Sequence, residues 1–587
     1  MKIKKLLHCK PSDYKNKSYL HLIFFLSLFM IPGCGPVHVG PSPEIRVTKK
    51  PRVILHPTPL GDGGFLSRDL FRSYWTPPSS DDDLISIGVV LSEDEIQFRG
   101  DKDFLIRIYN DHTSLDIASP AGVLWRVKDL HITRPALIRY FAITEEMLLS
   151  STQSPNLAAL EKLKAQGFAS AQWIGPPKMD AMKKNPELGR WFLSYQSFSK
   201  IDAAKQFCWR QKKQGQKNCK VISRVGIPPL ASGTLKAHQS SFSKHFEGII
   251  ELISPQGPIE IFDVKNHLMS DELSHGQAYA SRLFIIPNAE SKFSLVQQTS
   301  FSEYLEGVVP AETFPAAHME ALKTQAIIAR TYALSHAPIE FSSMPFFTCA
   351  STRCQVYRGE GAKTQRTSTA VEQSKNLVLR DREGRFAHTY YHSVCGGHTE
   401  DKISSLGGKG FDYLRGLPDG PGHFISLQNE RQLQDFVRNP QGAYCETSSY
   451  SSKSKYRWTQ TLSQNQLRSI AKSQGLDGSL TDIRVLSRGV SGRAEKLLLS
   501  HRDQQKTIHG EFKIRSALGG LPSSLFILDS MKKGGTIHSL RIEGGGFGHG
   551  VGLCQIGAIG RAEQGQSFRD ILQAYYPGLT LDRIIEK

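Results

Sequence analysis

Residues 301–336 read FSEYLEGVVPAETFPAAHMEALKTQAIIARTYALSH, and the rest of the main domain is best understood from this stretch. Its second half repeats apolar residues at the spacing of one helix face: Met319, Leu322, Ala326, Ala329 and Ala333. Pro315 fits the first turn of such a helix, where a missing N–H group costs nothing. The pattern predicts a helix over residues 316–336 with a buried apolar face.

Glu312 lies just before the predicted helix, between Val309-Pro310 and Phe314. A carboxyl group among apolar side chains loses hydration, which raises its pKa toward values that suit proton donation. Spacing alone also allows a helix cap or a solvated surface residue at this position. Both the catalytic and the structural interpretation of Glu312 therefore stay open on composition and spacing.

The same stretch resembles the SpoIID/LytB family, which comprises stage II sporulation protein D and its amidase-enhancer relatives. The matching segments occur in family order, at residues 308–312, 320–326, 329–334, 349–357, 391–400, 413–416, 491–493, 546–555 and 575–578. The resemblance implies an α+β fold, a mostly β catalytic scaffold that carries the central helix, with a groove where its loops meet. We expect residues 84–110 and 240–587 to form this domain.

The resemblance also implies a reaction. Best-known members are lytic transglycosylases that cut MurNAc–GlcNAc bonds of peptide-stripped peptidoglycan strands and leave 1,6-anhydroMurNAc ends. In that mechanism one carboxyl group, here Glu312, is both general acid and general base, whereas ordinary glycosidases use two. Arg330 matches a family arginine that is expected to hold the substrate or orient Glu312. No cofactor is required for this chemistry.

Two glycine-rich loops and one helix supply the expected glycan contacts. Glycines allow close backbone approach to a ligand, so a histidine among them is presented to the site. The predicted substrate-binding residues are Gln325, His392, Ser393, His549 and Gln555. The alternative is that these glycines only make tight turns and that His549 satisfies backbone groups.

Nine cysteines are too few for a disulfide scaffold but enough for specific bridges. The sequence does not fix their connectivity, and the expected pairs are Cys208–Cys219, Cys349–Cys354 and Cys395–Cys445, with Cys554 left over. The resemblance also implies a candidate structural zinc site. Its candidate ligands are Cys349, Cys354, His392 and His398. Arg353 stands where the family often has histidine, which favours a disulfide over zinc for the first pair.

The N-terminus predicts export. A lysine-rich start and an apolar run over residues 22–31, about half of the ~20 residues that span a bilayer, read as a signal peptide. Residues 31–35, IPGCG, resemble a lipobox, so residues 1–33 would be removed and Cys34 lipidated. A conventional signal peptide is the alternative. Residues 34–80 then form a Pro-rich tether, and the protein is expected on a membrane, facing the periplasm or cell wall.

Composition and net charge limit the class of protein and the kinds of binding partner. The chain has 587 residues, 39% of them hydrophobic, and a net charge of 73 − 55 = +18. These values exclude a disordered protein, a collagen-like repeat and a polytopic membrane protein. The basic charge favours anionic wall polymer and lipid headgroups, whereas export disfavours nucleic acid. The expected partners are glycan strands, the membrane, and an N-acetylmuramoyl-L-alanine amidase.

An insertion interrupts the predicted catalytic domain at residues 111–239. Within it, residues 136–225 read as two βαβ halves about fifty residues apart, and they resemble a SPOR domain, whose family binds peptide-stripped glycan. An ordinary α/β insertion explains the same pattern. Three functions are therefore compared: a lipoprotein lytic transglycosylase, a non-catalytic wall-binding lipoprotein that activates an amidase, and a zinc-dependent wall hydrolase.

Overall fold

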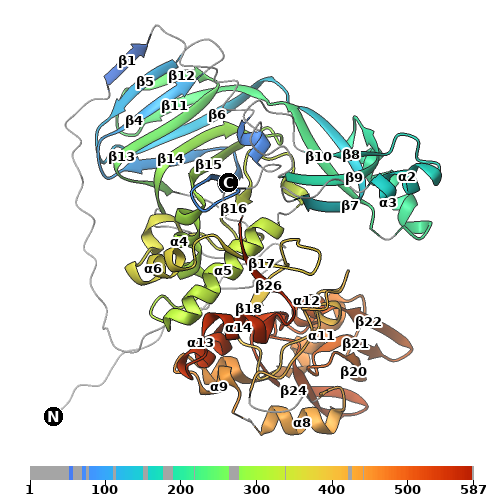
Figure 1. The fold of residues 1–587 in the computed structure, drawn as a ribbon. Helices are drawn as coiled ribbons and strands as arrows, with labels where there is room; N and C mark the ends of the chain where they lie inside the picture. The colour runs from blue at the N-terminus through green and yellow to red at the C-terminus, as the bar shows by residue number, and fades with distance from the viewer. Residues whose placement is uncertain are drawn as a thin grey trace, which may run out of the picture.

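The structure is a computed structural model, and it describes residues 52–56, 69–73, 78–109, 114–149, 157–175, 189–216, 218–262, 277–336, 339–420, 426–439 and 442–584. It is a mixed α and β molecule with more strand than helix, which agrees with the expected mostly β class. In Figure 1 a large sheet lies at the top, a helical layer in the middle and a second lobe at the bottom. The predicted signal peptide and Cys34 lie outside the described residues.

A twelve-stranded sheet forms the upper part of the main body. Its path runs β12-β11-β6-β3-β13-β14-β15-β2-β16, and β1, β4 and β5 pair beside it. The strands are β1 (Arg52–His56), β2 (Leu84–Glu93), β3 (Ile96–Gly100), β4 (Phe104–Tyr109), β5 (Ser114–Ser119), β6 (Trp125–Arg134), β11 (Leu230–Ala237), β12 (Ser243–Glu247), β13 (Ile249–Phe262), β14 (Gln277–Pro287), β15 (Phe293–Ser300) and β16 (Thr348–Cys349). Strand β13 is central because it pairs antiparallel with β14, β3 and β4.

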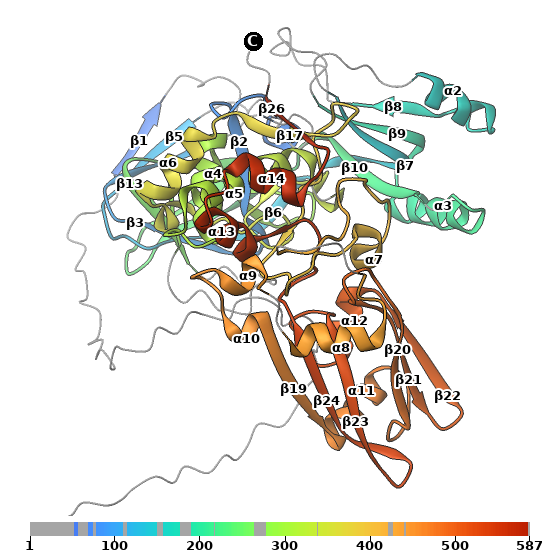
Figure 2. The ribbon, with the colours of Figure 1, turned by 60° about the horizontal axis from the view of Figure 1, so that its bottom comes forward.

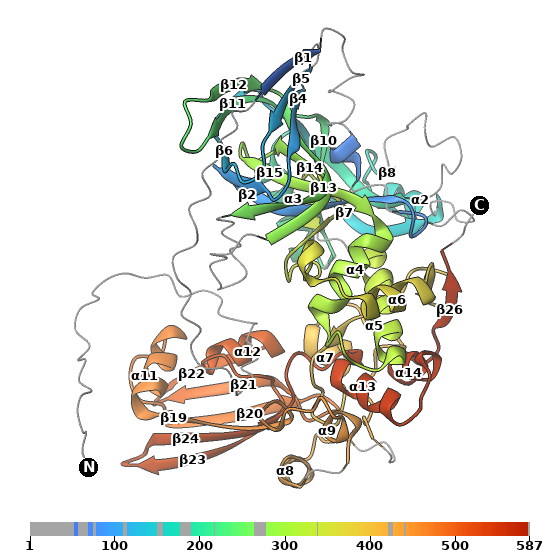
Figure 3. The ribbon, with the colours of Figure 1, turned by 90° about the vertical axis from the view of Figure 1, so that its left-hand side faces the viewer.

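Helices pack below this sheet and cover its lower edge (Figures 1 and 3). They are α4 (Phe301–Glu312), α5 (Met319–Ser335), α6 (Gln365–Gln373), α13 (Gln555–Glu563) and α14 (Phe568–Tyr575), with short 3-10 turns at Ile339–Phe341 and Gly359–Ala362. The predicted helix 316–336 is α5, which begins three residues later because Pro315 lies in the preceding turn. Ile327 and Arg330, which are not part of the predicted apolar face, are also buried, so α5 is a central helix rather than an amphipathic one.

The insertion folds as a separate small unit that projects to one side of the sheet (Figure 1). Its elements are β7 (Leu137–Leu149), α2 (Leu157–Ala165), β8 (Gln172–Ile174), β9 (Gly189–Phe198), α3 (Ile201–Lys213) and β10 (Lys220–Ile227). They form an antiparallel sheet in the order β10-β7-β9-β8, a βαββαβ arrangement with two βαβ halves. Many unrelated functions use this topology, so the SPOR-like function stays a prediction.

The second lobe lies at the opposite end from the large sheet (Figure 2) and has its own apolar core between Leu462 and Ile542. Its elements are α8 (Glu430–Arg438), β19 (Arg457–Ser463), α11 (Gln464–Ser473), β20 (Asp482–Arg488), β21 (Ala494–His501), β22 (Gln504–His509), α12 (Glu511–Ala517), β23 (Phe526–Lys533) and β24 (Thr536–Gly545). Residues 240–587, which the sequence predicts as part of one catalytic domain, therefore include a lobe with a separate core.

The other elements of the described residues are short. They are β17 (Leu377–Arg380), β18 (Tyr391–His392), α7 (Lys402–Leu406), α9 (Tyr444–Thr447), α10 (Lys453–Tyr456), β25 (Leu553–Cys554) and β26 (Thr580–Arg583). Strand β18 pairs in parallel with β25, and β17 pairs antiparallel with β26. The first pair brings the two glycine-rich loops of the sequence side by side.

Two predicted boundaries are wrong. The expected tether, residues 34–80, contains strand β1, which pairs with β5, and a helical turn at residues 69–73 that buries Leu70 and Phe71 in an apolar cluster. The insertion is also narrower than residues 111–239, because β5, β6 and β11 belong to the main sheet. In both cases at least one partner strand is far away in sequence, since β1 pairs with β5 and β11 pairs with β6. No described helix is long and apolar enough to cross a membrane.

Candidate functional site

Helix α4 places Glu312. Ser300 and Glu303 form a capping box at its start, and the helix runs directly out of strand β15. Its buried residues recur at i, i+3, i+4, i+7 and i+8: Phe301, Tyr304, Leu305, Val308 and Val309. Pro310 interrupts the helical hydrogen bonding, and the helix ends two residues later. Glu312 is therefore the last residue of a helix of its own, not a residue in the loop before α5.

The Glu312 carboxyl group meets three partners. Its Oε1 accepts a hydrogen bond from the Val356 N–H at 2.7 Å. The Tyr391 side chain also hydrogen bonds to it, and the positive charge of Arg358 acts on it. Among the groups that shift its pKa there is no second carboxyl group in the described part of the chain.

Burial raises the pKa of Glu312 to about 7, because the charged form loses its hydration. The Val356 N–H, Tyr391 and Arg358 oppose this rise, since each stabilises the carboxylate. A position at the C-terminal end of α4, where the helix dipole is negative, also disfavours the charged form. The group is thus protonated and ionised in similar amounts near neutral pH, as a general acid that later acts as a base requires.

A chain of hydrogen bonds orients Tyr391. Tyr304 donates its hydroxyl proton to Gln355 Oε1 at 3.2 Å, and Gln355 Nε2 donates to the Tyr391 hydroxyl oxygen at 3.2 Å. Because the oxygen of Tyr391 accepts from Gln355, its own proton is left to point at Glu312. This arrangement fixes Tyr391 as a donor to the carboxyl group.

Two predicted substrate-binding residues, Gln325 and Gln555, meet beside Glu312. Gln555 Nε2 donates to the Glu312 carbonyl oxygen at 2.8 Å and to Gln325 Oε1 at 3.3 Å. Gln325 comes from α5 and is buried, and its Nε2 has no hydrogen-bond partner in the part of the chain that the structure describes. Gln325 thus keeps an unused amide donor and is linked through Gln555 to the backbone of Glu312.

The histidines of the two loops are held by backbone groups. His549 Nδ1 accepts from the Val551 N–H at 3.0 Å, so its Nε2 carries the proton and donates to the Tyr391 carbonyl oxygen at 2.9 Å. His392 Nδ1 lies 3.2 Å from the Val551 carbonyl oxygen, and burial lowers the pKa of both rings to about 4. Both ring nitrogens of His549 thus bond to backbone groups, as its structural alternative expects. For His392 this holds for Nδ1 alone, because its buried Nε2 has no backbone partner among the described residues.

Ser393 lies between the same loops, where its carbonyl oxygen accepts from the Ile556 N–H. The loops thus position Tyr391 and Gln555 through the parallel β18–β25 pair, rather than by presenting their histidines. Tyr391 begins the matching segment 391–400, and no feature of the sequence marks it as a neighbour of Glu312.

Arg330 does not share the contacts of Glu312. Its guanidinium is fully buried and makes a two-pronged ion pair with Asp81, with both N–O distances at 2.7 Å. Its Nη1 also donates to the Leu377 carbonyl oxygen at 3.1 Å. These contacts tie α5 to the segment before β2, so the expected role in orienting Glu312 is replaced by a structural one. The partner lies 249 residues away in sequence, which is why the motif did not reveal it.

Two disulfide predictions are confirmed and one is wrong. Cys208–Cys219 and Cys349–Cys354 are bonded, whereas Cys395 and Cys445 are free, as is Cys554. The bond between Cys349 and Cys354 removes the thiolates that a zinc ion would need, so the zinc ligands implied by the resemblance do not fit.

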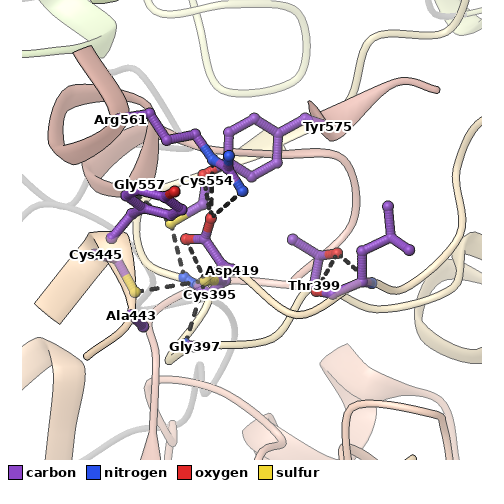
Figure 4. Close-up of polar contacts among 12 residues, drawn as sticks. Cys395, Gly397, Thr399, Asp419, Ala443, Cys445, Cys554, Gly557, Arg561 and Tyr575 are labelled. Atoms are coloured by element: carbon purple, nitrogen blue, oxygen red, sulfur yellow. Dashed lines mark hydrogen bonds and ion pairs between the residues drawn. The ribbon is translucent and has the colours of Figure 1, made fainter. Parts of the chain in front are cut away.

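His398, another expected zinc ligand, is buried with Nδ1 2.6 Å from the Thr399 carbonyl oxygen. Neither His398 nor His392 belongs to the compact group of potential metal ligands that the described residues form. That group consists of Cys395, Asp419, Cys445 and Cys554, and it is drawn in Figure 4.

The sequence missed several neighbours of Glu312. Val356 and Gln355 follow the Cys349–Cys354 bridge, which holds their loop against α4. Arg358 lies two residues further along. Their position directly after a predicted cysteine pair was a usable signal, because a short bridged loop is a rigid support for a site.

Comparison with known proteins supports the resemblance. Residues 289–380 match the family model described as stage II sporulation protein, and this range contains α4, α5 and Glu312. Residues 401–552, which include the second lobe, match a family model described as a domain of unknown function. The resemblance to the SpoIID/LytB family is therefore confirmed for the segment that carries the site.

Three similar proteins cover about half of this chain. An uncharacterized protein of Brachyspira hyodysenteriae is 27% identical over 52% of this chain and 73% of its own length. The amidase enhancer of Bacillus subtilis is 27% identical over 47% of this chain and 40% of its own length. Stage II sporulation protein D of Bacillus amyloliquefaciens is 26% identical over 49% of this chain and 75% of its own length.

Proposed function

We propose that this protein is a peptidoglycan lytic transglycosylase that acts on peptide-stripped glycan strands, with Glu312 as the single general acid and base. The observation that carries the proposal is a half-buried carboxyl group with a pKa of about 7 and no second carboxyl group among the described residues that shift its pKa. A hydrolytic glycosidase needs two carboxyl groups. One carboxyl group is enough when the nucleophile is a hydroxyl of the sugar itself.

The steps follow from this environment. Protonated Glu312 gives its proton to the glycosidic oxygen, and the bond from that oxygen to C1 of the MurNAc residue breaks. The Glu312 carboxylate, stabilised by the Val356 N–H, Tyr391 and Arg358, then takes the proton of the C6 hydroxyl. The C6 oxygen attacks C1 and closes the 1,6-anhydro ring, so Glu312 ends protonated and no water is consumed.

The buried amides and nearby aromatic rings suit a sugar ligand. Gln325 has an unused amide donor, and Gln555 fixes its orientation and links it to the backbone of Glu312. Phe314 and Tyr450, whose ring centroids are 4.8 Å apart, are half-buried and come from the segment after Glu312 and the loop after α9. Aromatic faces of this kind pack against the apolar face of a sugar ring.

Replacement of Glu312 by Gln tests the proposal. The full-length protein should cleave denuded glycan strands, and Glu312→Gln should lower the rate by about 100-fold or more while strand binding persists. Glu306→Gln is the matched control, since Glu306 lies on the same helix and faces Lys363. Equal rates for wild type and Glu312→Gln would refute the assignment of the acid.

A second candidate function rests on the similarity to an amidase enhancer. In this version the protein binds the wall and activates an N-acetylmuramoyl-L-alanine amidase without cutting glycan. The rate of peptide release from intact sacculi by such an amidase would then rise equally with wild type and Glu312→Gln. If only the wild type stimulates release, cleavage of strands is the cause.

We also propose that the protein acts outside the cytoplasm, anchored through a lipid on Cys34. The two disulfides in the described residues suit an oxidising compartment. Metabolic labelling with a radioactive fatty acid should mark the wild type and not Cys34→Ala. Label on both proteins, or on neither, would contradict the anchor.

A further inference from the structure

Four buried side chains from distant parts of the chain converge at the base of the second lobe. Cys395 follows β18, Asp419 lies in the loop before α8, Cys445 is in α9, and Cys554 ends β25. Their ligand atoms all lie within 4.8 Å of one another, and none of the four is exposed. Figure 4 shows the sulfurs and the carboxylate turned toward one another. We propose that Cys395, Asp419, Cys445 and Cys554 bind a structural zinc ion.

The spacing of the atoms fits a tetrahedral site. Cys395 Sγ lies 3.1 Å from Asp419 Oδ2 and 3.5 Å from Cys445 Sγ. A zinc ion with Zn–S distances of about 2.3 Å has sulfur–sulfur edges of about 3.8 Å. The sulfur–sulfur separation of 3.5 Å is slightly shorter than that value, and all four ligand atoms lie within 4.8 Å of one another, so an ion would need only small shifts of side chains. Three thiolates and one carboxylate form a soft ligand set, which binds zinc in preference to calcium or magnesium.

Backbone N–H groups already point at the sulfurs. The Gly397 N–H donates to Cys395 Sγ at 3.3 Å. Cys554 Sγ accepts from the Cys395 N–H at 3.1 Å and from the Gly557 N–H at 3.3 Å, the latter at the N-terminus of α13. Such donors stabilise a thiolate and therefore suit a metal ligand.

The carboxylate is held for one-oxygen ligation. Asp419 Oδ1 accepts from the Tyr575 hydroxyl at 2.7 Å and pairs with Arg561 at 3.3 Å, which leaves Oδ2 on the side of the sulfurs. Arg561 is itself packed on the rings of Tyr444 and Tyr575. These groups are the supporting partners that orient a metal-binding carboxylate, and Arg561 offsets part of the negative charge.

The atoms around the cluster are closely packed. A Cβ at Gly557 would overlap Asp419 Oδ2 and the Tyr575 hydroxyl. The loops are also bonded to one another, since the Asp419 N–H donates to the Gly397 carbonyl oxygen and the Tyr444 N–H donates to the Asp419 carbonyl oxygen. The cluster is thus rigid before any ion enters.

The place of the cluster gives its function. Cys395 and Cys554 lie just outside the segment that matches the second family model, residues 401–552, and Asp419 and Cys445 lie within it. An ion there would fasten both ends of the lobe to the body. It would also fix the β18–β25 pair that presents Tyr391 and Gln555 to Glu312, without contacting the substrate.

Metal analysis of the full-length protein, purified without a metal-binding tag, tests the proposal. The wild type should hold one zinc ion per chain, and Cys445→Ser and Cys554→Ser should lose it. Cys208→Ser is the matched control, because that cysteine lies in the insertion, and it should keep the ion. Tyr575→Phe should weaken zinc affinity by about 10- to 100-fold.

Two further measurements separate loss of metal from loss of folding. Replacement of zinc by Co²⁺ in the wild type should give the strong sulfur-to-cobalt absorption and visible bands of a tetrahedral thiolate site. Asp419→Cys should keep the ion and strengthen that absorption. A wild-type protein that takes up neither ion and contains a Cys395–Cys445 disulfide by peptide mass analysis would overturn the proposal, while the assignment of Glu312 would stand.

Discussion

Among single residues, Glu312 combines two opposing influences. Burial raises its pKa to about 7, while the Val356 N–H, Tyr391 and Arg358 stabilise its charged form. Without the burial the group would be an ordinary carboxylate at neutral pH, and without the donors it would not release its proton to act as a base. The combination lets one group perform both steps of a ring closure.

The raised pKa predicts a pH-dependent stability difference between wild type and Glu312→Gln. A carboxyl group whose pKa rises from 4.5 to about 7 on folding favours the folded state below pH 4.5 and loses that contribution as the pH rises to 7. Glu312→Gln carries no such penalty and keeps an acceptor for Val356. Its free energy of unfolding should therefore match the wild type at pH 4 and exceed it by roughly 1–3 kcal/mol at pH 8.

Urea unfolding of both proteins at pH 4, 6 and 8 measures this difference. A constant difference across the three pH values would contradict the raised pKa. Glu306→Gln serves as the control on the same helix.

The buried pair of Arg330 and Asp81 gives a second residue-level prediction. Both side chains are fully buried, so Arg330→Met leaves an uncompensated carboxylate and should lower the free energy of unfolding by about 3–5 kcal/mol. Asp81→Asn combined with Arg330→Met should recover part of the loss. The exposed pair Lys375–Asp82 is the control, and Lys375→Met should leave stability unchanged within error. Additive losses in the double variant would show that the two residues do not interact.

Single residues could be predicted only where chemistry and motif agree. Glu312, Gln325 and Gln555 were identified because the family motifs name their positions, and they do meet in space. The predicted role of Arg330 was wrong because its partner, Asp81, lies 249 residues away in sequence and no motif connects the two. The sequence also did not predict that Cys395 and Cys445 are free, because the residues that surround them come from distant parts of the chain.

Among the elements, α4 matters most for the site because it ends at Glu312. Its sequence carried the signals of a helix, a capping box at Ser300 and Glu303 and an apolar stripe, but Gly307 and Pro310 lower helix propensity and hid it. Helix α5 was predicted well because its pattern has no such interruption. Packing against α5 and α6 stabilises α4 against its poor intrinsic propensity.

The absence of a side chain at Gly307 allows α4 to pack closely against its neighbours. A Cβ at this position would overlap the ring of Tyr357, the residue after Val356. Gly307→Ala should lower the free energy of unfolding by about 1–3 kcal/mol and reduce strand cleavage, because the Val356 N–H would move away from Glu312. Gly361→Ala, where a Cβ meets nothing within 4 Å, is the control. Equal stability and activity of the two variants would show that α4 tolerates a shift.

The whole chain consists of parts with separate cores. The main body, the second lobe and the insertion each have their own buried clusters. The sequence predicted the two βαβ halves of the insertion from local patterns, but it misplaced the edges of the main sheet, where β1 pairs with β5 and β11 pairs with β6 across long sequence distances. The second lobe was not recognised because its strands carry no motif used to define the domain.

Separate cores predict more than one thermal transition in calorimetry. The bridge Cys208–Cys219 closes a short loop in the insertion and should stabilise that unit alone by about 3 kcal/mol. The variant Cys208→Ala/Cys219→Ala should lower one transition temperature and leave the others in place. A single transition that shifts as a whole would contradict independent units.

The mass of the cleavage product tests the proposed reaction better than any variant. Denuded glycan strands are incubated with the full-length protein in water enriched in oxygen-18, and the fragments are analysed by mass spectrometry. The proposed ring closure predicts fragments one water lighter than hydrolysis products and free of oxygen-18. Fragments with a reducing end that carries oxygen-18 would show hydrolysis and contradict a single-carboxyl mechanism at Glu312.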